Sequence, residues 1–450
     1  RDVAPSRGLG DVYKRQVNGR VDGSSRFGGN NKYGFFPSGS VAWRISEEGF
    51  MEPVKAVINN LKLRTSYGFT GNTEIGVYES LATLESNSWT IGNQLVSGFY
   101  PNRIPNPDLK WEKTGQFDIG FDLGLFNNRL RLTADYYYKK TTDLLYNVAI
   151  PSASGYDSML KNIGSVQNKG YELSIESDNL SGAFSWTTAF NISFNRNKVL
   201  ELGGETYKDV GTYDDHLKTS DIRRLIVGQP IGVFYGYRFD GIFQNEAECA
   251  QQTSSPSPIG VGLRRYKDLN GDGKIDATND REILGDANPK FFGGMTNTFA
   301  YRGFELNVFL QYSYGNKIFN YNAMELESPT GGQNVYQDLV NRWTPTNPSN
   351  EYQKATTNRN NIVSDRFIED GSFLKLKTVS LSYSFPKLNW KHIGGLRLYV
   401  TGQNLLTWTK YRGYDPEVSY RGASTLEAGE DFGGYPQART FMFGIKLDIK

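Results

Sequence analysis

Residues 268–280, DLNGDGKIDATND, carry an oxygen-bearing side chain at nearly every second position. A twelve-residue calcium loop places its ligands in this way and uses a glycine for the sharp turn. The matching ligand positions here are Asp268, Asn270, Asp272, Lys274 through its carbonyl, Asp276 and Asn279. Asn279 stands where a bidentate glutamate is usual, with Asp280 next to it. The sequence predicts a weak structural calcium site, and the alternative is an Asx- and glycine-rich turn that needs no metal.

Catalytic chemistry has little support. His216 and His392 are the two histidines of the chain, and neither belongs to a metalloprotease motif or accompanies a nucleophile motif. The acidic pair in TYDDH, residues 212–216, would serve a glycosidase only if the fold set two carboxylates about 5 to 9 Å apart. We therefore predict no catalytic residue and no enzyme.

Alternating apolar and polar residues indicate the elements that must position any site. From Phe117 to Tyr138 an apolar side chain stands at nearly every second position, with a break at Asn127 and Asn128. Successive side chains of a strand point to opposite faces, and asparagine tolerates the backbone of a tight turn. The segment predicts an antiparallel hairpin with one apolar face and one polar face, called below the dry face and the wet face.

Similar segments predict about eleven strands, with almost no helical periodicity. They lie near residues 32–46, 61–71, 110–125, 129–145, 163–178, 184–196, 289–302, 304–316, 367–385, 395–409 and 436–449. The links between them alternate in length, and the long ones are 72–109, 146–162, 197–288, 317–366 and 410–435. Tight turns at one end and long loops at the other are typical of outer-membrane barrels, whose strands face lipid on one side and a polar lumen on the other.

The predicted fold class is therefore all-β, a transmembrane antiparallel β-barrel. The wet faces predict the residues that line its lumen, namely Asp118, Asp122, Arg131, Asp135, Asn191, Asn307 and Gln311. The alternative is a secreted soluble all-β protein that binds carbohydrate, in which the dry faces pack against each other.

Composition agrees with a barrel. The formal net charge is +2, which gives no footprint for nucleic acid, and no apolar run approaches the length of a spanning helix. The single cysteine, Cys249, excludes a disulfide scaffold. The 27 phenylalanines, 28 tyrosines and 7 tryptophans suit two aromatic girdles at membrane interfaces or a sugar-stacking surface.

Four strings carry a family resemblance that runs over nearly all of residues 17–450. They are DGSSRFGGNNKYGFFPSGSVAWRISEEGF (22–50), NLKLRTSYGFTGN (60–72), GQNLLTWTKYRGYDPEVS (402–419) and YPQARTFMFGIKLDIK (435–450). Together they resemble the C-terminal half of the SusC/RagA family of TonB-dependent outer-membrane transporters of Bacteroidota. The resemblance implies about eleven strands of a 22-strand plugged barrel.

It also implies energised import of large nutrients, either glycans and oligosaccharides or peptides. The implied partners are a SusD-like surface lipoprotein that lids the barrel, TonB acting through an upstream segment, and the lipid of the outer membrane. Calcium is the one cofactor predicted. The aromatic string at 235–244 would then contact substrate or lid through Tyr235, Tyr237, Phe239 and Phe243, although local β packing is the favoured interpretation.

Two features of the chain ends complete the predictions. Residues 1–16, RDVAPSRGLGDVYKRQ, lack periodicity and are interpreted as a non-native scar, which leaves residues 17–450 as the C-terminal part of a barrel without its plug and TonB-contacting segment. Family members usually end on an aromatic residue, whereas here Ile449 is followed by Lys450.

GYDPEVS, residues 413–419, is interpreted as a turn in which Pro416 fixes the backbone.

Overall fold

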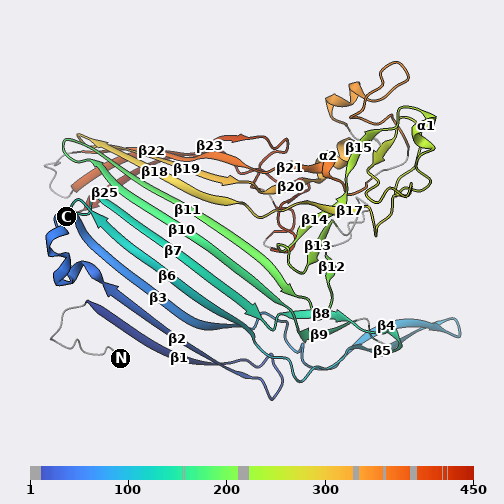
Figure 1. The fold of residues 1–450 in the computed structure, drawn as a ribbon, viewed down its shortest axis with the longest axis horizontal. Coiled ribbons are helices and arrows are strands. Elements are labelled where there is room, and N and C mark those ends of the chain that lie inside the picture. Colours follow the sequence, from blue (N-terminus) through green and yellow to red (C-terminus); the bar gives the residue numbers. More distant parts are fainter. Residues whose placement is uncertain are drawn as a thin grey trace. The chain divides into compact units, whose positions relative to one another are not determined.

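The computed structural model describes residues 12–154, 156, 158–210, 222–327, 334–357, 361–385, 393–417, 419–422 and 424–449 (Figure 1). Its contacts divide the chain into two compact units. Unit 1 comprises residues 1–176 and 196–206, and unit 2 comprises residues 177–195 and 207–450. Among the described residues, no helix is both long and apolar enough to span a membrane.

Each unit holds long antiparallel strands, and β10 and β11 are assigned here to the unit that holds most of their residues. Among the described residues of unit 1, six long strands pair in the order β1 (Tyr13–Gly23), β2 (Tyr33–Arg44), β3 (Ile58–Asn72), β6 (Glu112–Leu125), β7 (Leu130–Thr142) and β10 (Ser165–Leu180). In the part of unit 2 that the structure describes, six more pair in the order β11 (Phe184–Glu201), β18 (Phe291–Tyr301), β19 (Phe304–Tyr314), β22 (Phe373–Ser384), β23 (Ile393–Thr409) and β25 (Thr440–Ile449).

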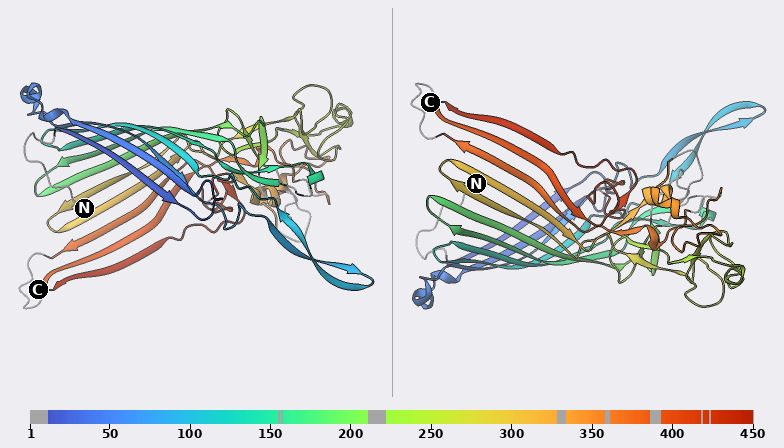
Figure 2. Two further views of the ribbon diagram at one scale, coloured as in Figure 1. Left: turned by 90° about the horizontal axis from the view of Figure 1, so that it is seen from below. Right: turned by 90° about the horizontal axis from the view of Figure 1, so that it is seen from above.

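Shorter elements occupy the connections. The strands are β4 (Thr83–Ile91), β5 (Gln94–Arg103), β8 (Leu145–Ala149), β9 (Ser158–Asn162), β12 (Tyr207–Val210), β13 (Arg223–Ile226), β14 (Val233–Tyr237), β15 (Phe239–Ile242), β16 (Arg264–Tyr266), β17 (Arg281–Gly285), β20 (Lys317–Asn320), β21 (Ile368–Asp370) and β24 (Glu430–Asp431). The helices are α1 (Glu246–Cys249) and α2 (Tyr321–Leu326), with 3₁₀ turns η1 (Ile45–Glu47), η2 (Gly49–Val54), η3 (Ser152–Ser154), η4 (Gln337–Asn341) and η5 (Asp365–Phe367). In unit 1, the β4–β5 hairpin is the long light-blue ribbon of Figures 1 and 2.

The hairpin predicted between Phe117 and Tyr138 is confirmed. Strands β6 and β7 pair in continuous register from Lys113 opposite Thr142 to Leu125 opposite Leu130. The turn uses left-handed backbone at Asn127 (φ 59°) and Asn128 (φ 61°), and also at Phe126 (φ 54°). Asn59 of β3 stabilises the turn, because its side-chain oxygen accepts the backbone N–H of Asn128 at 3.2 Å.

Each of the eleven predicted ranges overlaps one of the long strands, so the all-β antiparallel prediction is confirmed. The described chain adds one long strand that the pattern did not predict, β1, which pairs with β2 from Tyr13 opposite Trp43 to Gly23 opposite Tyr33. The alternation of β1 is weak, since Arg15 and Gly19 occupy positions on its apolar side. Residues 13–16 of the segment set aside as a scar therefore pair in a sheet, while residues 1–11 lie outside the described part. The origin of that segment stays a prediction.

Connection lengths alternate within each unit as predicted. In unit 1, β6 and β7 are joined by four residues, whereas β3 and β6 are separated by the segment that holds the β4–β5 hairpin. In unit 2, two residues join β18 to β19, whereas the link from β19 to β22 holds β20, α2, η4, η5 and β21. Below, the end of each sheet where short connections join the strands is called the short-link end. The opposite end is called the long-link end.

A buried apolar core lies in the long connections of unit 2. Phe234, Phe319, Tyr321, Met324 and Phe367 are each at most 2% exposed and pack together. Apolar residues of the long strands are instead turned outward, as in β25, where Phe443 is 82% exposed. A soluble protein rarely leaves so large an apolar face uncovered, so the dry face calls for an apolar surrounding.

This face can be tested at its middle, where Val308 of β19 pairs with Val379 of β22. We expect Val308→Arg to destabilise the folded protein in lipid vesicles by about 2–4 kcal/mol, because a charge at the bilayer midplane loses its hydration. Denaturant titration of the intact protein in vesicles measures the change. Asn307→Arg, one residue away on the wet face, is the matched control and should be tolerated. Equal losses in both variants would contradict a lipid-facing assignment.

Candidate functional site

The dry face of unit 2 carries a band of aliphatic side chains between two groups of aromatic rings. Leu306, Val308 and Leu310 of β19 form part of the band. At the short-link end, Phe304 stands 4.5 Å from Tyr383, measured between ring centroids. At the long-link end, Phe291 stacks on Tyr314 at 5.0 Å. An apolar band flanked by two aromatic girdles is the outer surface of a transmembrane β-barrel.

The wet face of unit 1 brings together two of the predicted lumen residues, Asp122 and Asp135. Arg64 of β3 donates to Asp135 at 2.8 Å and lies 3.3 Å from Asp122. Asp118 accepts from Ser66 at 3.2 Å and from Gln116 at 2.8 Å. Arg131 lies apart from this group and pairs with Glu176 at 3.0 Å.

Sequence reasoning missed Arg64, the cation at the centre of this group. Its position follows from register, because Arg64 stands opposite Gly120 and Gly120 stands opposite Asp135. Gly120 leaves room for the pair, since a Cβ there would lie 2.0 Å from the Asp135 carboxylate. A hollow of about 650 Å³ adjoins the group and is lined by residues that include Gln16, Ser40, Lys62, Arg64, Ser66 and Asp118.

The wet face of unit 2 is neutral at mid-strand. Asn307 donates to Thr298 at 2.9 Å, and the hydroxyls of Ser380 and Thr401 lie 2.8 Å apart. Asn191 accepts the backbone N–H of Gly294 at 3.1 Å. These side chains form a ladder across neighbouring strands and offer hydrogen-bond donors and acceptors without formal charge.

Towards the long-link end the wet face of unit 2 holds a buried lysine. Lys375 of β22 is 1% exposed, and its ammonium lies 3.1 Å from Asp415 and also binds Glu417. Gln311 donates to Glu417 at 2.9 Å, so a predicted lumen residue joins the same group. Burial raises the pKa of Asp415, but backbone N–H groups of Glu417 and Gln437 together with the Lys375 ammonium outweigh it and hold that pKa below its ordinary value.

We name the contact of Lys375 with Asp415 and Glu417 the Lys375 latch. The sequence interpretation of GYDPEVS as a turn fits the bond from the Glu417 N–H to Asp415, at 3.0 Å. It did not foresee that both carboxylates reach a strand about forty positions earlier. The latch fixes the connection after β23 against the wet face of the sheet.

The predicted aromatic contact residues are largely packed inside the long connections. Tyr237 is 9% and Phe243 1% exposed, so neither presents a free ring face to a ligand. Tyr235 is half-buried beneath the Arg224 guanidinium, 3.9 Å from the ring centroid. Phe239 is half-buried beside Arg366, at 5.0 Å. These positions support local packing, the interpretation favoured from the sequence.

Buried ion pairs join the long connections of unit 2. Arg223 and Glu430 are each 1% exposed and meet at 2.9 Å. Burial raises the pKa of Glu430, and the Arg223 guanidinium opposes that shift. Glu327, also 1% exposed, accepts from Arg366 at 2.8 Å and from Arg412 at 3.2 Å. Each pair connects segments far apart in the chain.

The predicted calcium loop closes through backbone hydrogen bonds. Asp268 accepts the N–H groups of Gly271 at 2.6 Å and Gly273 at 2.7 Å. Asp280 is fully buried and accepts the N–H groups of Leu269 and Asp276. Asn270 donates to Asp272, and Asn279 donates to Asp276. The backbone N–H of Lys274 donates to the Asp272 carboxylate.

In this arrangement the loop's carboxylates do not converge on one point. Within the described ranges, no three or more His, Cys, Asp or Glu side chains gather as a metal site would need. Calcium at this loop stays a prediction. His216 and His392 lie outside the described residues.

Known proteins share the sequence and fold of this chain. Residues 10–242 match the family model described as "TonB dependent receptor-like, beta-barrel". The chain is 42% identical over 437 residues to TonB-dependent receptor P3 of Formosa agariphila, covering 95% of this chain and 43% of that protein. It is 30% identical over 445 residues to TonB-dependent receptor SusC of Bacteroides thetaiotaomicron, covering 96% of this chain and 41% of that protein.

Among solved structures, the RagAB peptide transporter superposes with a TM-score of 0.81 at 28% identity, covering 98% of this chain and 46% of that chain. The chain therefore spans less than half the length of each relative.

The latch generates a prediction about local stability. Lys375→Met leaves two carboxylates beside an apolar group, a change that costs about 3–5 kcal/mol when one partner of a buried pair is removed. We expect residues 410–417 to lose amide hydrogen-exchange protection in the full-length protein. Lys377→Met, whose side chain is 26% exposed and 3.4 Å from Glu417, is the matched control and should have a small effect. Unchanged protection in Lys375→Met would contradict the latch.

The same contact predicts a pH dependence. Because the folded pKa of Asp415 is lowered, its contribution is complete above the unfolded value of about 3.9 and is lost as pH falls through the folded value. Exchange of residues 410–417, corrected for the intrinsic rate, should rise only below about pH 4. A rise near neutral pH would assign the protection to another group.

Calcium binding is tested on the full-length protein with chelated and calcium-loaded samples. Calcium at a hundredfold excess over its Kd should stabilise the folded state by about 2.7 kcal/mol, seen as a higher unfolding midpoint. Asp272→Ala should remove this effect, whereas Glu246→Ala, on the exposed start of α1, should retain it. No calcium effect in the wild type would leave the loop as a turn held by its own hydrogen bonds.

Proposed function

Because the chain belongs to the TonB-dependent receptor-like β-barrel family, we propose that it supplies part of the barrel of an active importer in a Bacteroidota outer membrane. One observation carries this proposal. The same strands have an apolar face, with a group of aromatic rings at each end, and a polar face. Such a wall separates lipid from a hydrated conduit. The plug and the TonB-contacting segment would lie in the part of the protein upstream of this chain.

We propose large glycans or oligosaccharides as the cargo. The ladder of Thr298, Asn307, Ser380 and Thr401 supports this, because neutral groups that both donate and accept suit sugar hydroxyls. Peptides are the competing cargo, since a solved relative is a peptide transporter. No described group of residues supports turnover of the cargo, and the relatives are receptors and transporters.

The proposed partner is a SusD-like surface lipoprotein that covers the long-link end. Two findings support it, namely the similarity to SusC and the similarity to the RagAB peptide transporter. The long connections of unit 2 form a packed layer at that end. Buried ion pairs, such as Arg223 with Glu430, join the segments of this layer. A rigid layer provides a defined docking surface for a lid.

The alternative of a soluble carbohydrate-binding protein requires the dry faces to cover each other. Family membership counts against it, and the two girdles of unit 2 have no role in a soluble sandwich. The two proposals differ in the fraction from which the protein is recovered.

Affinity purification of the tagged full-length protein from isolated outer membranes tests partner and location together. We expect a surface lipoprotein to co-purify in a near one-to-one ratio, as identified by mass spectrometry. Recovery of the protein alone from the soluble fraction would overturn the importer proposal.

The cargo is tested by uptake in a strain that carries the transporter as its only copy. Asn307→Leu should slow uptake of the preferred oligosaccharide by about 2- to 10-fold, the effect of one lost hydrogen bond of about 0.5–1.5 kcal/mol. Val308→Leu, on the dry face of the same strand, should leave uptake unchanged. Growth defects on peptides but not on glycans would assign the transporter to peptides.

A further inference from the structure

A hollow of about 540 Å³ opens on the dry face of unit 2 at the long-link end. Residues of β18, β19, β21, β22 and β23 and of the adjoining connections line it. Phe291, Tyr312, Tyr314, Leu374 and Trp408 form its apolar wall on the dry face, and Asp370, Ser372 and Lys410 form its polar rim. Ser313, Phe373 and Thr409 also line it, but by register they belong to the opposite face of the strands. Phe373 connects it to the latch, because the Phe373 ring lies 5.5 Å from the Lys375 ammonium.

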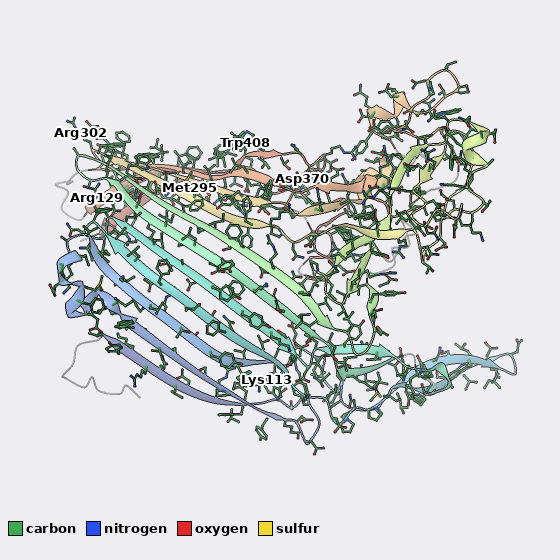
Figure 3. All side chains as sticks on the ribbon, viewed as in Figure 1. Lys113, Arg129, Met295, Arg302, Asp370 and Trp408 are labelled. Carbon is green, nitrogen blue, oxygen red and sulfur yellow. The ribbon has the colours of Figure 1, made fainter. Side chains whose placement is uncertain are left out.

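Strand register sets the apolar wall. Tyr314 stands opposite Phe291, Tyr312 stands opposite Leu374, and Leu374 stands opposite Trp408, so these side chains share the dry face. Trp408 is 51% and Leu374 41% exposed, so the surface is open to whatever surrounds the sheet. Figure 3 shows Trp408 projecting from β23 away from the sheet, with Asp370 farther towards the long-link end.

The rim is built from fixed polar groups. Asp370 accepts the Ser372 hydroxyl at 2.6 Å and its N–H at 3.1 Å, and the Ser372 hydroxyl accepts the Gly315 N–H at 2.9 Å. Burial raises the pKa of Asp370, but the Ser372 bonds and the charges of Lys317 and Lys410 lower it below its ordinary value. Lys317 of β20 stands opposite Asp370 in register, and Lys410 is the exposed cation of the rim.

We propose that this hollow binds one lipopolysaccharide molecule of the outer leaflet. An acyl chain would lie against Leu374 and Trp408, and the phosphorylated sugar would meet Lys410 at the rim. Position supports this occupant, because the hollow stands where the apolar band meets the long connections, the outward end of an outer-membrane barrel. Its lining also matches an amphiphile, since an aromatic wall suits the apolar chain and sugar rings while a cation attracts phosphate.

The proposal goes beyond import and does not depend on the identity of the cargo. It states that the barrel selects a particular neighbour in the outer leaflet. Such a contact would anchor the strand ends beside β20 and β21, which lead directly into the buried layer of the long connections.

Native mass spectrometry of the delipidated full-length protein in detergent tests the proposal, with purified lipid A as the probe and phosphatidylglycerol as the competitor. We expect lipid A to bind with a discrete stoichiometry and Lys410→Glu to weaken that binding by about tenfold, because the mutation removes one positive charge near phosphate and adds a negative one. Trp408→Ala should also weaken it. Tyr383→Ala, in the girdle at the short-link end, is the matched control and should bind as the wild type does.

Each outcome decides the matter. Retained heat-dependent gel migration of the variants shows that they are folded. Weaker binding in Lys410→Glu and Trp408→Ala alone supports the hollow as the site. Equal binding of phosphatidylglycerol, equal loss in Tyr383→Ala, or no discrete binding by the wild type would overturn it.

Discussion

The antiparallel ladder of backbone hydrogen bonds is the constraint on which the rest of this structure depends. A strand inside a bilayer has no water for its N–H and C=O groups, so each must pair with a neighbouring strand. Once the ladder is fixed, side chains alternate strictly between two faces. The same residues therefore determine both surfaces, and one face becomes apolar with two aromatic girdles while the other becomes polar. A shift of one residue in register would exchange them.

The long connections follow a different rule from the strands. They are freed from the ladder and pack as a soluble domain does, around Phe234, Phe319 and Phe367. Their buried ion pairs join segments distant in sequence, as Arg223 joins Glu430 and Arg366 joins Glu327. A buried ion pair adds little net stability over an apolar contact, but it penalises any arrangement that leaves one charge alone. We infer that these pairs select one arrangement of the connections.

The strands could be predicted from the sequence because their signal is local. Alternation with period two gave eleven of the twelve long strands found in the described chain, and β1 was missed where arginine and glycine interrupt it. The contacts that depend on register or on distant segments could not be predicted. Arg64 meets Asp135 only through the positions of three strands, and Lys375 meets Asp415 only because the connection after β23 turns back. The burial of Tyr237 and Phe243 likewise depends on tertiary packing that a short aromatic string does not encode.

The distribution of charge on the wet faces bears on how a cargo would be selected. In unit 1 the Arg64 guanidinium faces two carboxylates at 2.8 and 3.3 Å, and in unit 2 the Lys375 ammonium is enclosed by two more. Charges that are satisfied by each other bind a passing ion weakly, because a new partner must first displace the existing one. The neutral ladder of unit 2 offers many weak hydrogen bonds and no strong one. We infer that the strands provide a hydrated path of low affinity, so selection of the cargo falls to the long connections and to the parts of the protein that meet them.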